Sequence, residues 1–377
     1  HFGASGFLYP ALYGTAARVL GWEPYTGILL NMALIAISVL VLIYFAQFDR
    51  LQIVLTALLL VAIAPVLLYV PTISQESFHQ AAALILGALF FHLFNLNGNV
   101  SRRFVVIGIL FFILISLIRF SWIILIVPFL LFSQGKWTWR KSGLACVVSV
   151  VIALGILVVF QLTSTPGNNS IFARIGAVGS DPLIGLKVVW DYFAENLNYI
   201  FTVPDFRQFH IEFAQFFILL FGLLLSSRLF SRNDLSIAPK QFYFHIYNLC
   251  SILGASLILY VNVGFFRVLA PHLILSGILL IGFKGFRYVN TVIIIGLLGM
   301  GMFLADYREW SGNFSPYAPA QLETIDKSFA QYIRYDPQAT NPWCNTLLMN
   351  LKFLNLNATF VPAGMGISFF FDPVTQD

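Results

Sequence analysis

Long apolar segments separated by short polar joints, with Lys and Arg gathered in every second joint, constrain the fold of this chain most. Of its 377 residues, 59% are hydrophobic and only 10% are charged, and the mean hydropathy is +0.85. So few polar side chains cannot cover an apolar core in water, which excludes a soluble globule. The sequence therefore predicts an all-α polytopic membrane protein.

About 20 mostly apolar residues are needed for a helix to cross a bilayer, and fewer when the helix is packed among others. Segments of this kind predict about ten transmembrane helices, near 24–46, 51–71, 79–97, 104–117, 119–133, 143–163, 209–230, 243–262, 265–283 and 288–305. They define a transmembrane domain over residues 23–305, with a segment 1–22 before it and a segment 306–377 after it.

The basic residues of alternate joints predict the orientation. One set of joints holds more than half of the 21 Lys and Arg residues: Arg50, Arg102, Arg103, Lys136, Arg140, Lys141, Arg228, Arg232, Lys240, Lys284 and Arg287. Because basic residues of short loops remain cytoplasmic, the start of the chain, the loop 164–208 and the tail 306–377 are predicted to be extracytoplasmic. The net charge of +5 predicts contact with anionic lipid headgroups rather than with nucleic acid.

Residues 1–22 predict a helix at the membrane interface, since Pro10 suits a first turn and Gly21 suits a helix end. This helix is either a structural belt or the wall of a substrate groove. The first predicted span runs from outside to inside, and the chain begins at His1 rather than Met. We therefore expect a further amino-terminal span in the full protein.

The polar joint 72–79 holds the strongest acidic candidate. Glu76 and His79 are three residues apart, so a helix beginning here places both on one face. A carboxylate beside an imidazole can perform acid–base chemistry or bind a sugar hydroxyl. The alternative is a capping role, in which Ser74 and Ser77 cap the helix and the helix dipole favours Glu76.

Two arginines lie in apolar surroundings on the predicted outer side. Arg119 separates two short spans, and Arg267 opens another span together with His272. A cation there is costly unless it is paired or faces water, which makes both candidates for contact with a phosphate. Each could instead extend to the interface and serve only as an anchor.

The remaining polar segments give weaker signals. The Gly-rich first half of the loop 164–208 contains Arg174, and residues 183–200 predict an amphipathic helix on the outer membrane surface. The tail 306–377 predicts a small α+β segment with a helix over 319–335. No metal-ligand spacing and no nucleotide-binding motif occurs in the sequence, so no cofactor is indicated, although a divalent metal remains open.

Four short segments are similar to the GT-C superfamily of membrane glycosyltransferases. They are the start His1-Phe2-Gly3 leading into Leu-Tyr-Pro-Ala-Leu-Tyr, the turn Ser74-Gln75-Glu76, the joint Leu117-Ile118-Arg119, and the entry Phe266-Arg267-Val268-Leu269-Ala270-Pro271. The resemblance covers most of the chain as a layout, and the soluble tail after the last span also fits it.

The resemblance implies a transfer of sugar from a polyprenyl-phosphate donor to a lipid, glycan or protein acceptor on the extracytoplasmic face. It implies that Arg119 and Arg267 bind the phosphate and that Glu76 and His79 support the sugar or acceptor. The acidic residues typical of the superfamily would precede His1, so the main catalytic residue is not identified in this sequence. His1, His272 and Arg174 are further candidates.

Two other functions remain open at the level of sequence. An O-antigen-type polymerase or ligase would use Arg174 in the large outer loop, although the soluble tail argues against it. A lipid or solute transporter would normally show inverted halves or charges near the bilayer midplane. The sequence shows no internal repeat, and its outer charges gather near the ends of the predicted spans.

Overall fold

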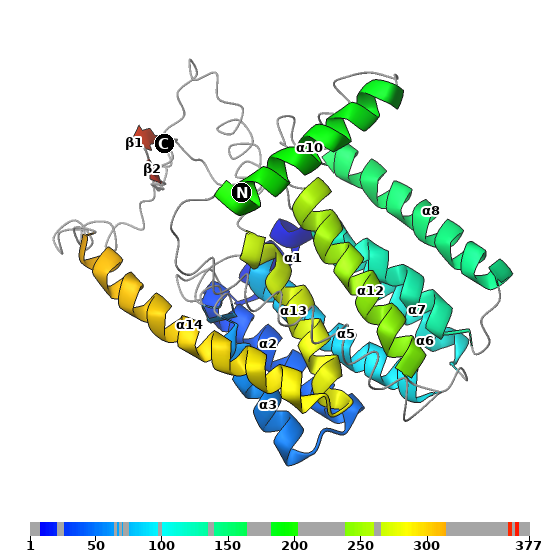
Figure 1. Ribbon diagram of the computed structural model, residues 1–377, viewed down its shortest axis with the longest axis horizontal. Helices are drawn as coiled ribbons and strands as arrows, with labels where there is room; N and C mark the ends of the chain where they lie inside the picture. Colours follow the sequence, from blue (N-terminus) through cyan, green and yellow to red (C-terminus); the bar gives the residue numbers. More distant parts are fainter. Residues whose placement is uncertain are drawn as a thin grey trace.

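The computed structural model describes residues 8–20, 26–63, 66–67, 70, 75–96, 100–134, 139–163, 182–202, 238–259, 265–313, 361–363 and 366–368. In these residues the chain is helical, apart from one antiparallel pair of short strands, β1 (Val361–Ala363) and β2 (Gly366–Ser368) (Figure 1). The predicted all-α architecture is thus confirmed for the main body. The helix predicted over 319–335 lies outside the described residues.

The helices of the main body follow the predicted spans, apart from α1 and α10, which lie in the segment 1–22 and the loop 164–208. They are α1 (Leu8–Leu20), α2 (Thr26–Ala46), α3 (Arg50–Ala62), α5 (Gln75–Asn95), α6 (Arg102–Ile118), the 3₁₀ helix η1 (Phe120–Leu125), α7 (Ile126–Phe132), α8 (Trp139–Thr163), α10 (Pro182–Thr202), α12 (Ala238–Gly254), the π-helix η2 (Ala255–Leu259), α13 (Phe265–Gly282) and α14 (Phe286–Asn313). Each predicted span contains a helix except 209–230, which lies outside the described residues.

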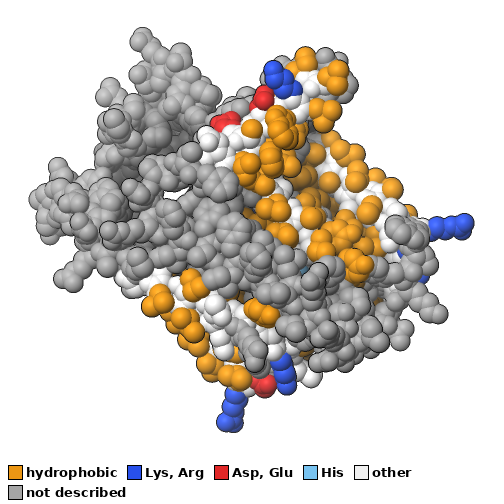
Figure 2. All heavy atoms as spheres, in the orientation of Figure 1, with side chains coloured by type: hydrophobic (Ala, Val, Ile, Leu, Met, Phe, Trp, Pro, Cys, Tyr) orange, Lys and Arg blue, Asp and Glu red, His pale blue; other side chains and the backbone are white. Residues whose placement is uncertain are grey.

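Three of these helices are long and apolar enough to cross a membrane: α2, α5 and the part of α8 from Arg140 to Val159. Helix α5 is mostly buried in the bundle, whereas most side chains of α2 and α8 are exposed or half-buried. Figure 2 shows apolar side chains spread over the sides of the described helices. Such a surface suits lipid better than water and indicates a membrane protein.

Helix α5 packs against α2 and α13, and α3 packs against α13 and α14 (Figure 1). Small residues allow the close approach of these helices. A Cβ on Gly87 of α5 would lie 2.8 Å from Cγ2 of Ile278, and a Cβ on Gly277 of α13 would lie 2.5 Å from Cδ2 of Leu59. Gly at helix crossings is typical of membrane bundles, where close packing replaces the hydrophobic effect.

Polar side chains fasten the end of the bundle at which α3 begins. Asp49 and Gln52 form a capping box at the start of α3. The side-chain nitrogen Nε2 of Gln52 also donates to the carbonyl oxygens of Ile281 and Gly282, each at 3.1 Å. These bonds satisfy carbonyl groups at the end of α13 that have no partner within their own helix.

Three boundaries differ from the sequence predictions. In the span predicted over 51–71, α3 ends at Ala62, Ile63 is extended with φ −92° and ψ 94°, and Val66 and Leu67 are helical again. The span predicted over 243–262 changes to a π-helix at Ala255. Helix α14 continues to Asn313, beyond the end of the span predicted over 288–305.

The amphipathic helix predicted over 183–200 is confirmed as α10. Its apolar residues Leu183, Leu186 and Trp190 are exposed, whereas Tyr192 and Asn196 are buried. The side-chain nitrogen Nδ2 of Asn196 donates to the carbonyl oxygen of Leu257 in η2 at 3.0 Å. Helix α10 is therefore held by a polar contact and turns apolar side chains away from the bundle.

Candidate functional site

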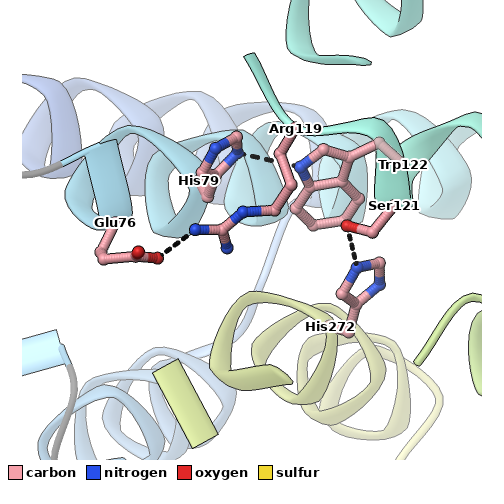
Figure 3. Close-up of polar contacts among 6 residues, drawn as sticks. All are labelled: Glu76, His79, Arg119, Ser121, Trp122 and His272. Carbon is pink, nitrogen blue, oxygen red and sulfur yellow. Dashed lines mark hydrogen bonds and ion pairs between the residues drawn. The ribbon is translucent and has the colours of Figure 1, made fainter. Parts of the chain in front are cut away.

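Four of the residues singled out in the sequence lie together in a buried cluster. Glu76 and His79 come from the first turns of α5, Arg119 ends α6, and His272 lies in the first half of α13 (Figure 3). All four side chains are almost completely buried, with exposed fractions between 0 and 3%. Segments far apart in the sequence thus place a carboxylate, a guanidinium and two imidazoles inside the helical bundle.

Glu76 and Arg119 form a buried ion pair in which an amino group of Arg119 donates to the carboxylate. Arg119 can reach it because the chain leaves helical geometry at this residue, with φ −145° and ψ 117°. Arg119 therefore does not extend to the surface as an anchor. Glu76 acts as its counter-ion and also lies in the first turn of α5, where the helix dipole favours a carboxylate.

His79 has one identified ring partner. The indole Nε1 of Trp122 donates to Nδ1 of His79 at 3.0 Å. Since an indole nitrogen can only donate, Nδ1 carries no proton, and the proton of the neutral ring is on Nε2. His79 Nε2 is buried and has no hydrogen-bond partner among the described residues.

His272 is held through both ring nitrogens, at 2.8 Å between Nδ1 and Asn248 Oδ1 and at 3.1 Å between Nε2 and the hydroxyl of Ser121. The amide nitrogen of Asn248 donates to the carbonyl of His272 and to the hydroxyl of Ser276. The side-chain oxygen Oδ1 of Asn248 can only accept, so Nδ1–H of His272 donates to it. Ser121 then donates to His272 Nε2.

Aromatic contacts connect the two histidines. The ring of Trp122 stacks on His272 with centroids 4.2 Å apart and an interplanar angle of 29°. The same Trp122 ring lies 6.2 Å from the ring of His79. Residues of α5, η1, α12 and α13 therefore form one continuous buried network.

Helix α1 packs beside this cluster. Tyr9 and Tyr13 are buried against Ile118 at the end of α6, and the Tyr13 hydroxyl donates to Asn31 of α2. Burial raises the pKa of Tyr13 to about 12. Burial also raises the pKa of Tyr9, with further contributions from Tyr13 and from the Glu76 carboxylate. Both phenols stay protonated near neutral pH and line the Glu76 side of the cluster.

Several buried polar atoms around the ion pair lack a hydrogen-bond partner within the described part of the chain. They are Gln75 Oε1, Ser77 Oγ and His79 Nε2 at the start of α5, and Ser116 Oγ and Arg119 Nη1 at the end of α6. Native structures leave few buried polar atoms unsatisfied. Their concentration in two adjoining helix ends marks this region as a candidate ligand site.

The remaining sequence candidates are not placed in this cluster. His1 and Arg174 lie outside the described residues. Arg267 lies in the first turn of α13, five residues before His272, and its side chain is not described. In the described ranges, no group of three or more His, Cys, Asp or Glu side chains could hold a metal ion.

Sequence reasoning missed the partners that hold the histidines. Asn248, which bonds His272, and Ser251, which bonds the carbonyl of Ser121, follow His245 at steps of three residues in an otherwise apolar segment, and all three are buried. This helical spacing of polar residues was the available signal. Ser121 gave no such signal, because its hydrogen bond with His272 depends on the loss of helical geometry at Arg119.

The chain matches no protein-family model, no curated protein and no solved structure. The function of the cluster is therefore inferred from its own geometry.

Proposed function

We propose that this chain belongs to a membrane glycosyltransferase. It would move a sugar from a polyprenyl-phosphate donor to a lipid, glycan or protein acceptor on the extracytoplasmic face. The observation that supports this most is the set of unpartnered polar atoms around the buried Glu76–Arg119 pair. Charged groups inside a membrane bundle are costly and are typical of binding or transfer sites.

The hydrogen-bonding capacity of these atoms fits a sugar phosphate. Arg119 Nη1 and His79 Nε2 are donors, which suit phosphate oxygens, while Gln75 Oε1 is an acceptor, which suits a sugar hydroxyl. The hydroxyls of Ser77 and Ser116 can serve either part. A ligand with only donors or only acceptors would satisfy fewer of them.

The position of the cluster supports an outer-face reaction. Exposed basic residues lie at the starts of α3, α6 and α8 and between α13 and α14: Arg50, Arg102, Arg103, Arg140, Lys141 and Lys284. Glu76 and Arg119 lie at the opposite ends of α5 and α6 from Arg102 and Arg103. With these basic ends on the cytoplasmic side, the cluster belongs to the extracytoplasmic half of a multi-pass protein.

In this proposal Arg119 binds a phosphate oxygen through Nη1, while its other amino group stays paired with Glu76. Glu76 fixes the guanidinium and lowers the net charge of the site, so that a phosphate with one or two negative charges can leave after transfer. Arg267 is proposed as the second phosphate contact. The wall formed by Tyr9 and Tyr13 suits the face of a sugar ring.

The proposal is tested by transfer of radiolabelled sugar from a polyprenyl-phosphate donor in the full-length protein. We expect Arg119→Ala to lower kcat/KM at least about 100-fold, because a buried charge-assisted contact is lost. Arg119→Lys should restore only part of the activity, because Lys cannot contact Glu76 and phosphate through a planar fork. Unchanged transfer in both Arg119→Ala and Arg267→Ala would exclude the phosphate role.

A lipid or solute transporter is the second candidate, because the described helices contain interruptions. The 3₁₀ helix η1 follows the break at Arg119, η2 is a π-helix, and Pro271 lies inside α13. Interrupted helices around buried charges are typical of transport sites. Uptake into sealed vesicles without any sugar transfer would favour this function.

A further inference from the structure

The geometry around His79 fixes both its tautomer and its orientation. Trp122 donates to Nδ1 at 3.0 Å, which leaves the Nε2–H as the only donor of the neutral ring. The His79 side chain is fully buried, and a buried N–H without an acceptor destabilises a protein. An acceptor for this N–H is therefore expected at the site.

Trp122 is in turn held by a second group of residues. Its ring stacks on His272, whose Nδ1 donates to Asn248 and whose Nε2 accepts from Ser121. The Asn248 amide cannot rotate freely, because its nitrogen also donates to the His272 carbonyl and to Ser276. Between Asn248 and His79, the two hydrogen bonds at the ends each have one direction, and the stacked rings of His272 and Trp122 connect them.

We propose that His79 binds the ligand as a neutral hydrogen-bond donor through Nε2–H, and that Trp122, His272 and Asn248 are positioning residues for it. This inference rests on the proposed function and names the contact that His79 makes. The ligand atom is an oxygen that accepts a hydrogen bond, supplied either by the phosphate or by the sugar. His79 is then not an acid–base group.

Two substitutions of His79 separate the two ring nitrogens. His79→Asn keeps an oxygen near the Nδ1 position that can accept from Trp122, but it has no N–H at the Nε2 position. His79→Gln places an amide N–H near the Nε2 position and so serves as the matched rescue variant. Both remove the aromatic ring, so a purely structural role of the ring would affect them equally.

Binding is measured by titration calorimetry of the full-length protein in lipid nanodiscs, with farnesyl phosphate, farnesol and a methyl hexoside as probes. We expect His79→Asn to weaken binding of farnesyl phosphate about 10- to 100-fold, as for loss of a hydrogen bond to a charged group. His79→Gln should stay much closer to the wild type, and farnesol binding should not change. A loss confined to the methyl hexoside would assign the oxygen to the sugar.

Trp122→Phe provides the second measurement, since it keeps the stacking on His272 but removes the indole N–H. We expect the ¹⁵N spectrum of histidine-labelled protein to show that His79 changes from one tautomer to a mixture, with weaker probe binding. The His79→Gln spectrum identifies the signal among the six histidines of the chain.

The outcomes distinguish the inference from the proposed function. If wild-type protein binds farnesyl phosphate or the hexoside, and His79→Asn binds each probe as tightly as the wild type does, the inference fails and the proposed function stands. If the wild type binds neither probe, both fail together. An unchanged His79 tautomer in Trp122→Phe would overturn the positioning role of Trp122.

Discussion

The buried pair Glu76–Arg119 determines how single residues of the cluster respond to substitution. Removing both charges from water is costly, and each charge compensates the other only while both are present. The pair is almost fully buried, with side chains exposed by 3% for Arg119 and 2% for Glu76. Loss of one partner therefore affects stability more than loss of both.

We expect Glu76→Ala to lower the free energy of unfolding by about 3–5 kcal/mol, because it leaves the Arg119 charge buried and unpaired. Glu76→Gln, which keeps an acceptor but no charge, should lie between Glu76→Ala and the wild type. The measurement is thermal unfolding of purified protein in one detergent.

The control for this prediction is the double variant Glu76→Leu with Arg119→Met. Apolar residues of similar volume often replace a buried pair without loss of stability. The double variant should therefore be closer to the wild type than Glu76→Ala. A double variant less stable than Glu76→Ala would contradict this interpretation of the pair.

At the residue scale, the sequence identified four members of the cluster but not their pairing. Glu76, His79, Arg119 and His272 stood out because ionisable residues are rare in apolar segments. Which of them pair depends on how far α6 reaches beside α5 and on the backbone angles at Arg119. The sequence predicts the break at Arg119 but neither of these details.

At the scale of elements, aromatic packing decides where the helices can touch. Phe129 of α7 is buried among Phe90, Phe104 and Phe112. A Cβ on Gly108 of α6 would lie 2.2 Å from Cζ of Phe129. Helices α6 and α7 are therefore in contact through a glycine that faces an aromatic ring.

We expect Gly108→Ala to destabilise the protein by about 1–3 kcal/mol, because the surrounding rings leave Phe129 little room to move. Gly155→Ala on α8 is the matched control, since a Cβ there meets nothing within 4 Å. The control should be neutral or stabilising by up to about 1 kcal/mol through helix propensity. Equal effects in thermal unfolding would show that the Phe129 contact is unimportant.

The sequence predicted the existence of these elements better than their ends. Apolar runs and the break before Arg119 were sufficient to locate α6, η1 and α7. The π-helix η2 was not predicted, because Ala-Ser-Leu-Ile-Leu has a composition that also suits an α-helix. It contacts α10, which is distant in the sequence, and that contact does not follow from composition.

At the scale of the whole molecule, the proposed orientation places Arg103 and Lys187 on opposite sides of a membrane. Both side chains are exposed, at the start of α6 and on α10. We expect Lys187→Cys to react with a membrane-impermeant thiol reagent in intact cells, and Arg103→Cys to react only after permeabilisation. The cysteines Cys146, Cys250 and Cys344 are first replaced by Ser, and the cysteine-free protein measures background labelling. Reaction of both positions under the same condition would overturn the orientation.

The Glu76–Arg119 pair also bears on how such a chain is made. Its two residues are 43 positions apart, so the ribosome completes α5 well before Arg119 is synthesised. During that interval Glu76 has no counter-ion, and a lone carboxylate is poorly tolerated in lipid. Biogenesis is therefore expected to hold α5 at the translocon until α6 emerges and to release the two helices as a hairpin.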